Sequence, residues 1–97
     1  MNDWRHLPGG EILEEGLADL RAGRETPFAL VVAIGAPRLG WLGIDVPPAP
    51  HEPEHRLYDL LALDDADSAH SRYNAFIRRL VSLERALECA SERAASE

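Results

Sequence analysis

The stretch AHSRYNAFIRRLVSLERALECASERA, residues 69–94, decides the fold that we expect for this chain. Its apolar residues recur at alternating intervals of four and three residues, the heptad spacing of a helix that packs along one face. We call these residues the seam: Ala69, Tyr73, Phe76, Leu80, Leu83, Leu87, Ala90 and Ala94. Beside the seam, Ile77 and Val81 widen the apolar stripe. Such breadth is typical of a bundle helix, so at least two other helices are predicted to contact it.

Two further helices are predicted from the same kind of spacing. Residues 11–22 form the first, because Gly23 is a natural stop and an apolar face is made by Leu13, Gly16, Leu17 and Leu20. The other follows Pro53 and runs for about three turns, with Leu57, Leu60 and Leu61 on its buried side. Before it, the proline-rich residues 47–53 are predicted to form an extended connector.

The segment between these helices permits two interpretations. Thr26 and Pro27 match an N-cap followed by a proline in the first turn, which favours a short buried helix over residues 28–34. Residues 37–42 then predict another short helical turn that ends at Gly43. The alternative is a β-hairpin within residues 28–46, because the run from Phe28 to Ile34 is rich in β-branched residues.

The predicted fold is therefore a single all-α domain over residues 1–97, a small bundle of about four helices with a long C-terminal helix. The alternative is an α+β fold that contains the hairpin. With 45% hydrophobic and 28% charged residues, the composition is that of an ordered globular chain.

Charge and cysteine content exclude several classes of function. The net charge of -7 disfavours binding to a nucleic acid backbone, which requires clustered cations. Cys89 is the only cysteine, so an internal disulfide and a thiolate zinc site within one chain are excluded. The longest apolar run, residues 28–34, is too short to span a membrane, and the N-terminus lacks the apolar core of a signal peptide. We expect a cytoplasmic protein without a cofactor, and the use of arginine with no lysine suggests a bacterial source.

One polar cluster is a candidate ligand site. His70, Arg72 and Asn74 lie in the first turns of the predicted C-terminal helix, where backbone N–H groups and an arginine suit an anion. This cluster supports an alternative function as a small ligand-binding protein or enzyme, although no catalytic residue is assigned. His51 and His55 form a second polar cluster, but Pro53 disrupts the helical turn that would align them. We predict no metal site within one chain and leave a site shared between chains open.

The leading functional hypothesis is a non-catalytic interaction or oligomerisation module that pairs with a second copy or with another protein. The seam permits two interpretations: the long helix packs on the other helices of its own chain as an ordinary bundle core, or the shorter helices do not cover the seam from end to end. The second would leave Leu83, Leu87 and Ala90 exposed. In a parallel pairing of two long helices, Arg79 of one chain faces Glu84 of the other. The predicted interface consists of Tyr73, Phe76, Arg79, Leu80, Leu83, Glu84 and Leu87. A further alternative is that this acidic chain binds a basic protein, in the manner of an antitoxin.

Overall fold

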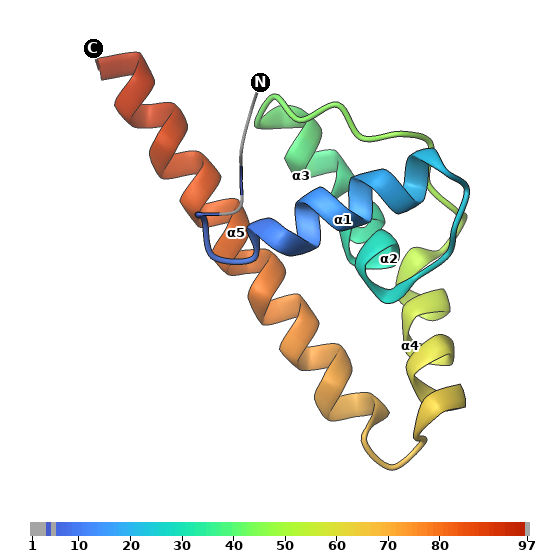
Figure 1. The fold of residues 1–97 in the computed structure, drawn as a ribbon. Helices are drawn as coiled ribbons and strands as arrows, with labels where there is room; N and C mark the ends of the chain where they lie inside the picture. Colours follow the sequence, from blue (N-terminus) through green and yellow to red (C-terminus); the bar gives the residue numbers. More distant parts are fainter. Residues whose placement is uncertain (1–3, 5, 97) are drawn as a thin grey trace.

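The computed structural model describes Trp4 and residues 6–96, with side chains described up to residue 90. This part of the chain contains five helices and no strand (Figure 1). The helices are α1 (Gly10–Arg21), α2 (Pro27–Ile34), α3 (Ala36–Trp41), α4 (Pro53–Asp64) and α5 (Ala69–Ser96). The predicted all-α fold is confirmed. The alternative hairpin within residues 28–46 is wrong, because α2 and α3 occupy most of that segment.

The short helix α2 lies at the centre of the fold and contacts each of the other four described helices. It begins as predicted: the backbone at Thr26 is extended, and its hydroxyl accepts a hydrogen bond of 3.2 Å from the N–H of Ala29. Five consecutive residues, from Ala29 to Ala33, are buried. A helix that is apolar all round is stable only when it is covered on all sides, and here this burial outweighs the strand preference of its β-branched residues.

The connection between α1 and α2 is fixed by a polar link. The Asp19 carboxylate accepts a hydrogen bond of 2.6 Å from the Thr26 hydroxyl and one of 3.0 Å from Arg24 Nε. These two hydrogen bonds, first that of Thr26 and then that of Arg24, lower the pKa of Asp19 below its ordinary value. The hydroxyl that caps α2 is thereby also tied to the end of α1.

Helices α1 and α2 approach each other closely at Gly16 of α1. A Cβ atom at this position would lie 2.5 Å from Cγ2 of Val32 and 2.6 Å from the carbonyl oxygen of Phe28. Neither distance is compatible with a van der Waals contact, so only glycine permits this spacing of α1 and α2.

Helix α4 follows a connector without regular structure and is joined to α5 by a short turn over residues 65–68. The two helices meet at this turn and diverge from it (Figure 1). Helix α2 contacts both of them. None of the helices in the described part of the chain combines the length and apolar character of a membrane-spanning segment.

The seam of α5 is covered within its own chain over most of its length. Leu83 is only 1% exposed and Leu87 only 8% exposed, while Ala90 is exposed. The expectation that Leu83 and Leu87 are uncovered is therefore wrong. The cover includes the turn before α1, since a Cβ at Gly9 would lie 3.2 Å from Cβ of Leu83. Gly9 has a φ of 74°, a left-handed conformation that glycine adopts readily.

Replacing Gly16 with alanine tests the contact between α1 and α2. We expect a lower free energy of unfolding, because separating two packed helices costs about 1–3 kcal/mol and outweighs a gain in helix propensity of at most about 1 kcal/mol. Gly40→Ala is the matched control, since it lies in α3 with nothing within 4 Å of an added Cβ. This control should be neutral or stabilising in the same chemical denaturation assay. A Gly16→Ala protein as stable as the parent would contradict the close packing.

Candidate interaction surface

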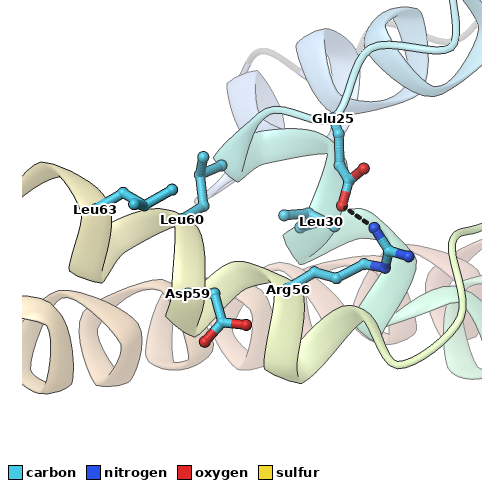
Figure 2. Close-up of a pocket in the computed structure, with 6 residues that line it drawn as sticks. All are labelled: Glu25, Leu30, Arg56, Asp59, Leu60 and Leu63. Atoms are coloured by element: carbon cyan, nitrogen blue, oxygen red, sulfur yellow. Dashed lines mark hydrogen bonds and ion pairs between the residues drawn. The ribbon is translucent and has the colours of Figure 1, made fainter.

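A shallow groove of about 360 Å³ lies between α2 and α4 on the surface of the described structure (Figure 2). We call it the α2–α4 groove; it is lined by Glu25, Leu30, Arg56, Asp59, Leu60 and Leu63. Leu30 of α2 is buried, and Leu60 of α4 is half-buried. Leu63, one turn after Leu60, is 85% exposed. The groove thus combines an apolar interior with an apolar side chain that projects into solvent.

Charged side chains of both signs border the groove. Nη1 of Arg56 lies 2.8 Å from Oε1 of Glu25, and Nε of Arg56 donates a hydrogen bond of 2.9 Å to the carbonyl oxygen of His51 (the ion pair is drawn in Figure 2). Asp59 lies on the same helix, three residues after Arg56. Since the ion pair is exposed, it contributes at most about 1 kcal/mol to stability. Its main effect is to hold the Arg56 side chain in place along the groove.

Leu63 occupies a different side of α4 from the leucines that enter the core. Leu57 and Leu61 are four residues apart and fully buried, whereas Leu63 aligns with Arg56 and Leu60 at spacings of four and three residues. A single exposed leucine is common on protein surfaces. Here, however, the exposed leucine extends a groove that already contains apolar atoms. Leu63 was not among the residues predicted to form an interface. The signal in the sequence was its position outside the predicted buried side of the helix, which is formed by Leu57, Leu60 and Leu61.

A second exposed apolar side chain lies on α3. Trp41 is 77% exposed, and the guanidinium carbon of Arg38 lies 5.9 Å from its ring centroid. Nη2 of Arg38 also forms an ion pair of 2.8 Å with Glu88 of α5. We call these three residues the Trp41 surface. The sequence analysis did not single out Trp41, because a tryptophan at the end of a short helix is equally compatible with burial.

The predicted interface on α5 is largely committed to contacts within the chain. Leu80, Leu83 and Leu87 are buried in the core, and the half-buried Phe76 meets Phe28 edge to face at 6.1 Å. Tyr73 is half-buried as well. These contacts leave little of the seam for a second chain in this conformation.

The two charges that the sequence analysis paired between chains also have neighbours within the chain. Nη2 of Arg79 forms an ion pair of 2.6 Å with Glu11 of α1. Burial raises the pKa of Glu84, and the positive charge of Arg38 partly offsets this effect. The pairing of Arg79 with Glu84 across two chains stays a prediction.

The predicted anion cluster does not converge on one point. The side chains of His70 and Asn74 are 3.2 Å apart, but Nη1 of Arg72 lies 2.7 Å from a carboxylate oxygen of Asp64. The turn before α5 is also acidic, with a carboxylate of Asp65 accepting hydrogen bonds from the chain that enters the helix. An anion at this site would have to compete with Asp64 for the arginine.

Metal chemistry has no evident site in the described part of the chain. Within it, no group of three or more His, Cys, Asp or Glu side chains is placed to hold a metal ion. Cys89 is exposed on α5. His55 lines a hollow next to α4 rather than facing a set of ligands. Whether His51 and His55 share a metal with another chain stays a prediction.

Comparison with known proteins identifies no relative of this chain. Neither a protein-family model, nor a curated protein, nor a solved structure matches it significantly. Functional inference therefore depends on the surfaces described above.

The same substitution at two leucines distinguishes the core from the groove. Leu83→Ala should lower the free energy of unfolding by about 2–5 kcal/mol, because it leaves a cavity beneath α5. Leu63→Ala should change it by less than about 0.5 kcal/mol, because Leu63 is in solvent. Both are measured by denaturant unfolding, at a protein concentration low enough to keep the chain monomeric. Equal losses of stability in the two variants would contradict the burial pattern.

Proposed function

We propose that this chain is a non-catalytic self-association module that pairs with a second copy through the α2–α4 groove. The observation that carries the proposal is Leu63, an apolar side chain 85% exposed at the edge of a groove that contains Leu30 and Leu60. The proposal keeps the interaction role expected from the sequence and moves the interface from α5 to α4. The reason is that the leucines of the seam already lie in the core of their own chain.

The groove has the mixed character that a symmetric interface needs. In a dimer with a two-fold axis, the same patch of both copies is in contact and must complement itself. The patch on α4 carries apolar residues, Leu60 and Leu63, together with a cation, Arg56. Asp64, at the end of α4, lies four residues after Leu60 and pairs with Arg72 of α5 within the chain.

An antiparallel pairing of two α4 helices around Leu60 gives the leucines and charged side chains of each copy a partner in the other. Arg56 lies four residues before Leu60 and Asp64 four residues after it, so each arginine lies opposite the aspartate of the second copy. Leu60 meets its own equivalent at the axis. Leu63 packs along the aliphatic stem of the opposite Arg56. The new ion pair forms by exchange, in which Arg56 leaves Glu25 and Asp64 leaves Arg72 of its own chain.

The magnitudes favour a reversible dimer over a permanent one. Burying an exposed leucine contributes about 1.5–3 kcal/mol, so the two copies of Leu63 contribute roughly 3–6 kcal/mol. Association costs about 4–15 kcal/mol in lost translational and rotational freedom. The other contacts of the interface must supply the rest of the free energy of association. We therefore expect the fraction of dimer to change with protein concentration.

A second candidate function is binding to a basic protein, which the acidic turn after α4 favours. Asp64, Asp65 and Asp67 follow directly after Leu63 in a chain of net charge -7. An apolar side chain flanked by arginine or lysine would complement this arrangement. The alternative of an anion-binding site at His70, Arg72 and Asn74 has weaker support, because Arg72 already pairs with Asp64.

The proposal is tested by measuring solution mass with size-exclusion chromatography and light scattering over a range of concentrations. The mass of the parent protein should rise toward that of a dimer, and Leu63→Asp should remain monomeric, because it places a carboxylate in the apolar contact. Trp41→Ala is the control at the other exposed apolar residue and should associate like the parent. A parent that is monomeric throughout, or a Leu63→Asp variant that still associates, would refute the proposal. Loss of association in Trp41→Ala alone would place the interface at the Trp41 surface.

The antiparallel register has its own test in a charge exchange. Arg56→Asp should weaken association by bringing two carboxylates together, and adding Asp64→Arg to the same chain should restore it. The unfolding midpoints of both variants serve as the control for the loss of the ion pairs that Arg56 and Asp64 make within the chain. Failure of the double variant to recover would exclude this register while leaving the role of Leu63 to the mass measurement.

A further inference from the structure

A second hollow, of about 290 Å³, opens between α4 and α5 and is separate from the α2–α4 groove. Three of its lining residues come from α4 and one comes from α5. They are Glu54, His55, Tyr58 and Tyr73. We call this hollow the tyrosine cleft. Its composition, two tyrosine rings, an imidazole and a carboxylate, differs from that of the apolar groove.

The two tyrosine rings lie against each other at the opening of the cleft. Their centroids are 6.0 Å apart and their planes are inclined by 56°. Tyr58 is 40% exposed, so part of its ring surface faces solvent, whereas Tyr73 is half-buried. Burial raises the pKa of Tyr73, and the charge of Glu54 raises it further. Glu54 lines the same cleft as the two rings.

Glu54 carries a negative charge that has no partner in the described part of the chain. Among the described residues, its carboxylate has no hydrogen bond and no ion pair, in contrast to Asp64 and Glu25, which each pair with an arginine. A ligand that occupies the cleft would meet this free carboxylate and the faces of two aromatic rings. The carboxylate attracts cations through its charge. The ring faces attract them as well, since an aromatic ring concentrates negative potential on its face.

We propose that the tyrosine cleft binds an organic cation, either a quaternary ammonium group or the guanidinium of an arginine. Tyr58 supplies the exposed ring face, Tyr73 the inner wall and Glu54 the counter-charge. The size of the cleft suits a small cationic group and is below the range typical of sites for larger ligands. Anions are repelled by Glu54 and by the net charge of the chain. The proposal is independent of self-association, because it uses other residues.

The probes are choline and capped arginine, added to the whole 97-residue chain while the ring protons of Tyr58 and Tyr73 are followed by nuclear magnetic resonance. Saturable shifts of these protons with either cation are expected. The neutral control is 3,3-dimethylbutan-1-ol, which has the shape of choline without its charge and should produce no saturable shift. Stronger binding of capped arginine would assign the site to a side chain of another protein, and stronger binding of choline to a free small molecule. Equal binding of the neutral alcohol, or no saturation with either cation, would overturn the proposal.

A pair of variants isolates the ring from the hydroxyl. Tyr58→Phe keeps the aromatic face and should bind within about twofold of the parent, whereas Tyr58→Leu should weaken binding about two- to fivefold. Glu54→Gln should weaken it by a similar factor, because it removes the counter-charge and keeps the shape. Unfolding midpoints confirm that each variant is folded. Equal affinity of the Phe and Leu variants, with the fold intact, would show that the ring does not bind the cation.

Discussion

The burial of α2 is the constraint on which the rest of the described structure depends. This helix of eight residues has an apolar surface on all sides, and such a helix is stable only when other elements exclude water from its whole circumference. Helices α1, α3, α4 and α5 each contact it, and the glycine at position 16 allows α1 to approach within the distance that this cover requires. The arrangement of the helices follows from the need to surround α2.

The same constraint explains why the seam of α5 is not free for another chain. A long apolar stripe beside a short buried helix is first used to complete the core of its own chain, and Leu80, Leu83 and Leu87 serve this purpose. Arg79 is likewise engaged by Glu11. Among the described side chains, the two most exposed large apolar ones lie on other helices, at Leu63 of α4 and Trp41 of α3, while Tyr58 of α4 and Val81 of α5 are exposed to a smaller extent.

Much of the architecture could be predicted because its signals are local. Thr26 and Pro27 determine the start of α2 through a cap and a fixed backbone angle, and Gly23 and Pro53 delimit their neighbours. The cover of Leu83 could not be predicted in this way. It depends on Gly9, far away in the sequence, whose left-handed turn brings the chain before α1 onto α5.

The candidate sites were harder to predict than the helices for a related reason. Leu63, Tyr58 and Glu54 are ordinary residues for a surface helix, and each becomes significant only through a neighbour from another element. Conversely, the sequence places His70 and Arg72 close together, but the pairing of Arg72 with Asp64 separates their roles. Residues in one helical turn need not form one binding site, because a charged side chain such as Arg72 can pair instead with an opposite charge on another element.

Helix α4 links the two proposals. One side of it enters the core, one side forms the α2–α4 groove, and one side forms the wall of the tyrosine cleft. Both surfaces place apolar or aromatic atoms next to carboxylates, at Glu25 and Asp59 in the first case and at Glu54 in the second. Arginine is one side chain that would suit both proposals, since it offers a cation, a planar face and an apolar stem at once. The two sides nevertheless remain separate proposals, because the groove and the tyrosine cleft have no lining residue in common.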